Sequence, residues 1–136
     1  MTDAVVDASV WVSRLVSGDV HHERCRDWFG NQSAANDLLV SPVSMLAEVA
    51  WAISRRTGQA SLASRAVALI LALPNLRLVS VDPDLGRLAA DLAAERALRG
   101  ADALYVATAS SLGLALVTLD QEQLERSAPL LTAISP

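Results

Sequence analysis

The sequence contains no lysine: its basic residues are 11 arginines, set against 15 acids, for a net charge of −4. This absence excludes several mechanisms. A P-loop needs a lysine on its phosphates, protein kinases need one on a strand, and Schiff-base enzymes need its amine. Receiver domains and haloacid-type phosphatases, which also group acids at strand ends, normally rely on lysine too. The negative charge argues against passive binding to nucleic acid, but it leaves binding through a metal ion or a local basic patch open.

Cysteine and long apolar runs are also scarce. The single cysteine, Cys25, excludes a disulfide within the chain. The longest apolar run, 66–73, is far shorter than the ~20 residues of a membrane-spanning helix. The amino-terminal MTDAVVDASV carries acids where a secretory signal carries basic residues. With 136 residues, of which 52% are hydrophobic, we expect one soluble, cytoplasmic domain over residues 1–136.

Short apolar segments alternate with helical patterns along the chain. We expect strands at 4–6, 37–41, 76–81, 115–119 and 131–134, and helices at 9–16, 20–28, 43–56, 61–73, 83–98, 102–112 and 121–126. Continuous apolar strands separated by helices indicate a parallel sheet covered on both faces. The pattern therefore predicts a three-layer α/β/α fold with a small parallel sheet flanked by helices. In such sheets the functional crevice lies beyond the carboxyl ends of the strands.

Four carboxylates have no basic partner at the helical spacings considered. Asp7 and Asp120 directly follow apolar strands. Glu48 is the only charged residue in MLAEVAWAI, and Asp102 has Tyr105 and no base at the next helical turn. These four acids are the candidate chemical groups of the chain.

Each acid also has a structural interpretation. Asp7 can cap the helix that follows it, and Asp102 can stabilise a helix N-terminus through the helix dipole. Asp120 with Gln123 matches a capping box, and Glu48 can lie on a solvent face. Taken together, however, they point to one edge of the sheet, where clustered carboxylates repel one another and need cations or shared protons. Oxygen ligands suit Mg²⁺ or Mn²⁺, and two such ions about 4 Å apart can promote phosphodiester hydrolysis.

The chain resembles the PIN-domain ribonucleases and, within them, the VapC-type toxins of bacterial toxin–antitoxin pairs. The resemblance covers nearly the whole length. It rests on VVDASVWV (5–12), SMLAEVAWA (44–52), LRGADALYVATA (98–109) and LVTLDQ (116–121). It implies a PIN-like fold in which Asp7, Glu48, Asp102 and Asp120 are the catalytic acids and the ligands of Mg²⁺ or Mn²⁺. Ser9 and Thr118 match hydroxyl positions that line the family's site.

The resemblance also implies a substrate and partners. The expected activity is metal-dependent endoribonuclease cleavage of RNA phosphodiesters by metal-activated water, with Arg14, Arg55 and Arg99 holding the flanking phosphates. The implied protein partner is a cognate antitoxin, and we also expect a homodimer. Large apolar side chains on the first and third helices suggest an exposed patch for such a partner: Trp11, Val12, Val49, Trp51 and Ile53.

Two other functions remain open. The chain can be a non-catalytic PIN-like module that binds RNA or protein, although mutually repelling carboxylates have no purpose in such a module. The third possibility is an α/β protein that binds a small molecule, but this chain lacks the glycine-rich phosphate loop that such a protein can use.

Overall fold

A parallel sheet forms the centre of the molecule. The computed structural model describes residues 2–136. Within them, five strands pair in the order β3-β2-β1-β4-β5, all parallel. The strands are β1 (Ala4–Val6), β2 (Leu39–Pro42), β3 (Leu76–Val79), β4 (Ala115–Val117) and β5 (Ala133–Ile134).

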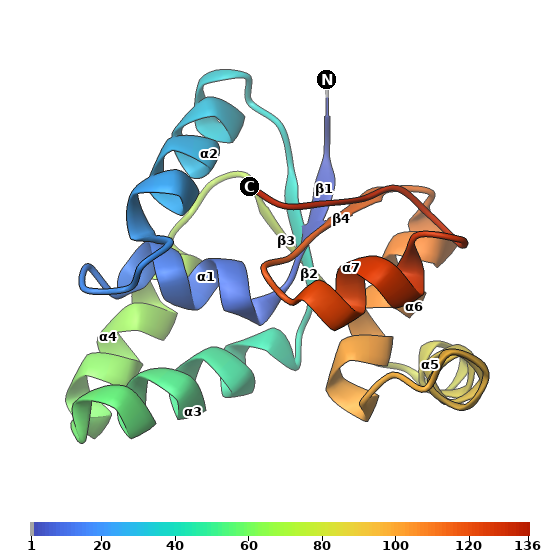
Figure 1. Ribbon diagram of the computed structural model, residues 1–136. Helices are drawn as coiled ribbons and strands as arrows, with labels where there is room; N and C mark the ends of the chain where they lie inside the picture. The colour runs from blue at the N-terminus through green and yellow to red at the C-terminus, as the bar shows by residue number, and fades with distance from the viewer. Residues whose placement is uncertain (1) are drawn as a thin grey trace.

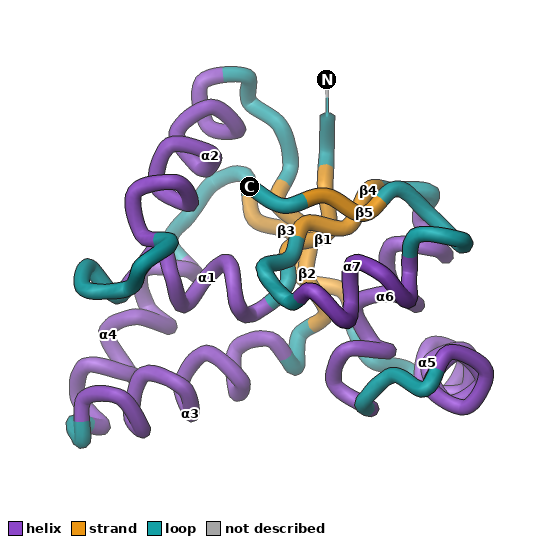
Figure 2. Tube along the Cα trace, in the orientation of Figure 1, coloured by secondary structure: helices purple, strands orange, loops and turns teal. Residues whose placement is uncertain are grey.

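Helices occupy the connections between the strands (Figure 1). In residues 2–136 they are α1 (Ala8–Leu15), α2 (His22–Ala34), α3 (Met45–Thr57), α4 (Ala60–Leu71), α5 (Pro83–Arg96), α6 (Gly100–Leu112) and α7 (Gln121–Ser127). Figure 2 shows the short strands gathered centrally with helices around them. α3 and α6 end at glycines with φ of 68° and 66°, a left-handed conformation that glycine adopts without a steric penalty.

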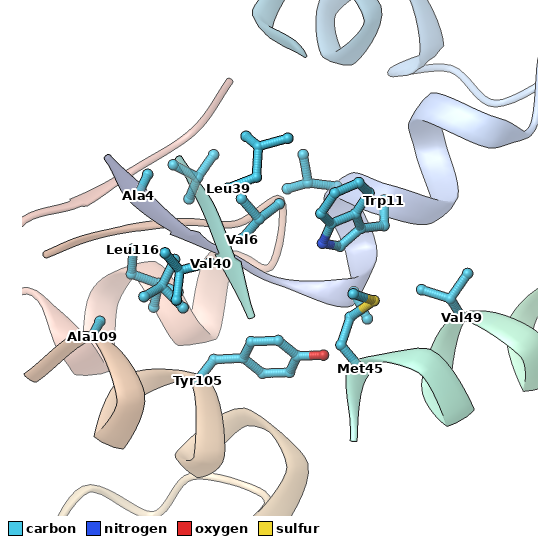
Figure 3. Packing of buried hydrophobic residues seen from close by; sticks show 14 of the residues in the cluster. Ala4, Val6, Trp11, Leu39, Val40, Met45, Val49, Tyr105, Ala109 and Leu116 are labelled. Carbon is cyan, nitrogen blue, oxygen red and sulfur yellow. The ribbon is translucent and has the colours of Figure 1, made fainter. Parts of the chain in front are cut away.

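The two faces of the sheet have different helical covers. Val5, Val40 and Leu116 share one face by register, and α6 packs against β1, β2 and β4 there, with Ala109 and Tyr105 nearby (Figure 3). Since side chains alternate along a strand, Leu39 points to the opposite face. There the Trp11 indole of α1 donates to the Ser41 hydroxyl at 3.1 Å. The three-layer α/β/α fold expected from the sequence is therefore confirmed.

Strand order determines where the active crevice can form. The chain moves outward in one direction from β1 to β2 and β3, then crosses to the other side for β4 and β5. The carboxyl ends of β1 and β4 therefore flank a topological switch point, the place where parallel sheets hold their ligands. Asp7 follows β1, and Asp120 follows β4 by three residues.

Several expected elements have different bounds in the structure. The helix expected at 20–28 extends to Ala34, because Phe29 and Gln32 are both buried and tertiary packing overrides the weak helix formers around them. The strands expected at 76–81 and 131–134 shorten to 76–79 and 133–134, at the two edges of the sheet. The strand expected at 115–119 shortens to 115–117, and the one expected at 37–41 lies at 39–42. Among residues 2–136, no helix has the length and apolar character that crossing a membrane requires.

The apolar patch expected on the first and third helices does not form. Trp11, Val12, Val49 and Ile53 are each at most 5% exposed and belong to the core. Trp51 alone of the five is exposed, at 64%.

Candidate active site

Asp7 sits at the junction of β1 and α1. As the N-cap of α1, its Oδ2 accepts the Ser9 amide at 3.3 Å. The same oxygen accepts hydrogen bonds from the Ser9 hydroxyl at 2.5 Å and the Thr118 hydroxyl at 3.0 Å. Oδ1 receives none of these bonds. Asp7 is 5% exposed, so its carboxylate is held rigidly with one oxygen left for another partner.

Thr118 and Gln123 join the end of β4 to the helices beside it. Thr118 Oγ1 lies 3.0 Å from Gln123 Oε1, and the Gln123 side-chain amide donates to the Asp102 carbonyl at 3.3 Å. The backbone amide of Gln123 donates to Asp120 Oδ1 at 3.1 Å, which makes Asp120 the N-cap of α7. Because Thr118 and Gln123 are fully buried, their hydrogen bonds fix α6 and α7 relative to Asp7.

Glu48 lies on α3, in its first turn. The Tyr105 hydroxyl of α6 donates to Glu48 Oε1 at 2.8 Å, across 57 residues of sequence. Burial raises the pKa of Tyr105, and the charge of Glu48 raises it further, so the phenol remains a donor. The hydrogen bond from Tyr105 therefore fixes the orientation of the Glu48 carboxylate.

Asp102 and Asp120 share one arginine. Arg99 Nε lies 3.0 Å from Asp102 Oδ2, and its terminal nitrogen lies 3.3 Å from Asp120 Oδ2. The interpretation of Asp102 as a carboxylate without a helical partner is thus wrong, because its partner stands three residues before it, where the chain enters α6. Ala97, with φ of 53°, makes the turn out of α5 that brings Arg99 to this place.

Three of the four acids have an elevated pKa. Burial raises the pKa of Asp7 despite the Ser9 and Thr118 hydrogen bonds, and the charge of Asp102 raises it further. Burial also raises the pKa of Glu48, with the charges of Asp7 and Asp102 adding to it against the Tyr105 hydrogen bond. Burial raises the pKa of Asp102 even beside Arg99. The acids therefore feel one another's charge, which is the signature of a cluster poised for chemistry or for a cation.

The cluster opens into a cleft of about 650 Å³. Glu48, Asp102 and Asp120 line it together with Ser9 and Arg99. Beyond the acids the cleft continues along α1 and α3; the residues lining that part are Val12, Ser13, Asp19, His21, Trp51, Ala52 and Arg56.

The donor set suits a hard divalent cation. Every candidate ligand is a carboxylate oxygen, which such cations prefer. The pKa of three of the acids is raised, so a nearby positive charge would stabilise their ionised forms. Asp7 Oδ1 has no protein donor among the bonds described above. Within residues 2–136, however, no three Asp, Glu, His or Cys side chains stand close enough to enclose a metal ion. The positive charge at the acids in this structure is the guanidinium of Arg99.

The other arginines expected at the site lie elsewhere. Arg14 lines a separate apolar hollow of about 440 Å³, together with Trp11 and Phe29. Arg55 lies over the ring of Trp51, 5.2 Å from its centroid. Of the three, only Arg99 contacts the acids.

Sequence reasoning missed the supporting roles of Tyr105 and Gln123. Tyr105 lies three residues after Asp102 and shares its side of α6, which is a signal that could have identified it. Gln123 was expected only as part of a capping box with Asp120. The structure instead turns its side chain inward to Thr118 and Asp102.

Known proteins share both the sequence pattern and the fold. The family model described as PIN domain matches residues 4–128. No curated relative matches the chain.

Solved structures of the same fold cover almost the entire chain. VapC20 from Mycobacterium tuberculosis, described as a sarcin-ricin loop cleaving toxin, aligns with 23% identity and a TM-score of 0.78 over 98% of this chain and 100% of that chain. PAE2754 from Pyrobaculum aerophilum aligns with 25% identity and a TM-score of 0.68, over 98% and 90% of the two chains. DNA-bound VapBC from Salmonella typhimurium gives 17% identity and a TM-score of 0.71, over 99% and 98%. With 4–128 of its 136 residues matched by the family model, the chain belongs to the PIN domain family.

Proposed function

We propose that the chain is a metal-dependent endoribonuclease that acts as the toxin of a toxin–antitoxin pair. One observation carries the proposal: Asp7, Glu48 and Asp102 come from three separate segments to one edge of the sheet, and burial, together with the charges of nearby carboxylates, raises the pKa of each. An arrangement that costs stability in this way is typical of a functional site.

The four acids would hold Mg²⁺ or Mn²⁺. A divalent cation held there would supply a lowered pKa for a bound water molecule and stabilisation of the leaving oxygen of a phosphodiester. Asp7 offers its free Oδ1, and Asp102 and Asp120 offer oxygens that now face Arg99. The charge of a bound cation would offset the repulsion between the carboxylates.

The surrounding residues orient the acids. Ser9 and Thr118 fix one oxygen of Asp7, and Tyr105 fixes one oxygen of Glu48. Arg99, whose side chain is 75% exposed, can turn from Asp120 to a phosphate of the substrate. Arg99 is therefore the best placed of the expected phosphate contacts. Arg55 does not line the cleft, but it lies over the ring of Trp51, which does. Arg14 lines the separate hollow, which RNA would have to reach.

A cognate antitoxin is the proposed protein partner. The solved structures that share this fold include DNA-bound VapBC from Salmonella typhimurium and a structure described as a toxin–antitoxin complex from Klebsiella pneumoniae. The apolar hollow beside α1 and α2 offers a surface for a partner segment: Leu69, 60% exposed, and Leu73 lie on it, with Arg14 and Arg26 among its lining residues. An apolar segment with acidic flanks would suit it. We propose a homodimer as well, and a cytoplasmic location.

The test expresses the chain alone and together with the reading frame immediately upstream of its gene. The proposal expects the chain alone to arrest growth, the neighbour to co-purify with it and relieve the arrest, and Asp102→Asn to be harmless. Purified wild-type chain should cut RNA in Mg²⁺, and Asp102→Asn should not.

A non-catalytic module makes the opposite prediction. Its wild-type form and its Asp102→Asn variant would bind RNA or a protein equally well, and both would leave RNA intact. A wild-type chain that is harmless and monomeric, and that does not bind its neighbour, would contradict the toxin assignment even though the fold stands.

A further inference from the structure

An exposed tryptophan lines the cleft that contains the acids. Trp51 is 64% exposed, whereas Trp11 is buried and Trp28 is partly buried. It follows Glu48 by three residues on α3, about 4.5 Å along the helix axis, and both residues line the same cleft. A large ring in water next to a candidate catalytic carboxylate requires an explanation, because exposing it forgoes the free energy of burying it.

Arg55 extends this surface. Its guanidinium carbon lies 5.2 Å from the centroid of the Trp51 ring, at the i,i+4 spacing that places two side chains on one face of a helix. The neighbouring Arg56 is paired with Asp19 at 2.7 Å, and Arg99 is paired with two of the acids. Arg55 has no carboxylate partner among the residues that the structure describes, so its charge is available to a ligand.

The charge of the site indicates what kind of ligand contact Trp51 and Arg55 can make. Four carboxylates and one arginine leave the acid end of the cleft negative, so it repels the phosphates of RNA. Substrate binding therefore needs contacts that do not depend on the phosphates. An aromatic face stacks on any nucleobase, and an adjacent guanidinium strengthens that stacking.

We propose that Trp51 and Arg55 form a stacking subsite for the base of a nucleotide that flanks the scissile phosphate. The inference rests on the proposed ribonuclease function and assigns its substrate a single-stranded segment at this position, since a base is free to stack only when it is unpaired.

A protein partner is a weaker explanation of the same residues. The exposed apolar side chains on this side of α3 are Ala47 and Trp51, and Val43, four residues before Ala47, lies in the turn that precedes the helix. Only Trp51 is large, and such a stripe falls far short of the roughly 800 Å² that each partner contributes to a stable interface. One aromatic ring beside one free arginine matches a base better than a protein surface.

The experiment measures RNA binding without cleavage, so that it does not depend on the proposed activity. A labelled single-stranded RNA of mixed sequence, and an abasic ribose-phosphate oligomer of equal length, are titrated with the full chain in chelator. Trp51→Ala should weaken binding of the RNA between about fivefold and 100-fold and leave binding of the abasic oligomer unchanged. Trp51→Phe should keep the affinity within about threefold, because a phenyl ring still stacks.

Fluorescence supplies a second readout. RNA should quench the tryptophan emission of the wild-type chain, and Trp51→Phe should abolish the quenching. The matched control is Leu112→Ala, which removes another exposed apolar side chain, 49% exposed, at the far end of α6 from Asp102. It should bind RNA as the wild type does.

Three results would overturn the subsite. One is equal RNA affinity for wild type and Trp51→Ala, or no measurable affinity for either. Another is an equal loss on the abasic oligomer, which would mean a structural or electrostatic effect. The last is a change of sedimentation from dimer to monomer in Trp51→Ala with RNA affinity retained, which would assign this face to a second copy of the chain. Failure of the wild type to cleave RNA in Mg²⁺ would instead count against the proposed function.

Discussion

The two carboxylate oxygens of Asp7 have different surroundings. Oδ2 is used by the helix cap and by two hydroxyls, whereas Oδ1 has none of these partners. An asparagine can keep the cap, because Asn and Asp serve almost equally well at that position. What it removes is the charge, which burial and Asp102 disfavour.

Asp7→Asn should therefore separate activity from stability. We expect RNA cleavage to fall about 100-fold or more, while the melting temperature in metal-free buffer stays the same or rises. Asp102→Asn should behave alike, since it loses only an ion pair with an exposed arginine. Asp82→Asn, at the N-cap of α5, is the matched control and should keep full activity. A clear loss of stability in both site variants would favour purely structural roles.

Tyr105 provides the second prediction at this scale. Tyr105→Phe removes only the hydroxyl that donates to Glu48. A hydrogen bond to a charged group contributes about 1.5–3 kcal/mol, so we expect kcat to fall roughly tenfold or more. KM should change little, since Tyr105 is fully buried and acts by positioning Glu48. Steady-state kinetics with a fluorogenic RNA measures both constants. An unchanged kcat would show that Glu48 needs no positioning.

Part of the candidate site could be predicted from the sequence at the residue scale. Asp7 and Asp120 were predictable because apolar strands end just before them, and the parallel sheet brings those ends together. Thr118 was expected only from the resemblance to the family. The position of Tyr105 beside Asp102 on α6 could have been read from the sequence, but its bond to Glu48, 57 residues away, could not. The bond of Gln123 to Asp102, 21 residues away, likewise depends on how α6 and α7 pack. The bridging role of Arg99 depends on the turn at Ala97, which the residue type does not indicate.

At the scale of elements, Asp19 connects three helices. Its Oδ1 accepts the Ser13 hydroxyl of α1 at 2.9 Å and the His21 amide before α2 at 2.8 Å. Its Oδ2 pairs with Arg56 of α3 at 2.7 Å. Burial acts to raise the pKa of Asp19, but Arg56 and the two other donors outweigh it and lower the pKa overall.

The effect of Asp19→Asn on the free energy of unfolding should depend on pH. A lowered pKa means that the ionised carboxylate stabilises the folded state at neutral pH, and that this contribution is lost as pH falls below about 4 and through the lowered value. We expect the variant to be about 1 kcal/mol less stable at pH 7, because the Arg56 side chain is half exposed. Urea unfolding across pH should show the difference shrink in acid. A constant difference at all pH values would mean that packing, and not charge, is responsible.

Element type was predictable more reliably than element length. Glycines, prolines and apolar runs defined every helix and strand, but the ends of α2, β3 and β5 depend on tertiary contacts. α2 continues past Trp28 because Phe29 packs against Trp11, with ring centroids 4.8 Å apart. That contact joins two helices, so local pattern alone could not place the end of α2.

At the scale of the whole molecule, charge is the main constraint. The chain carries −4 overall, and its acid cluster lies at the switch point of the sheet. RNA cannot approach this edge on net electrostatics alone. In the proposed function, a divalent cation at the acids, together with arginines and an aromatic surface along the cleft, would reconcile an acidic protein with an acidic substrate.

The most direct test of this account is cleavage of one labelled RNA by the purified chain, first in EDTA and then after addition of excess Mg²⁺ or Mn²⁺. The account predicts that EDTA abolishes cleavage, that either ion restores it, and that neither restores it to Asp102→Asn. Undiminished cleavage by the wild-type chain in chelator would contradict the account, because it would show that the reaction does not need a cation at the carboxylate cluster.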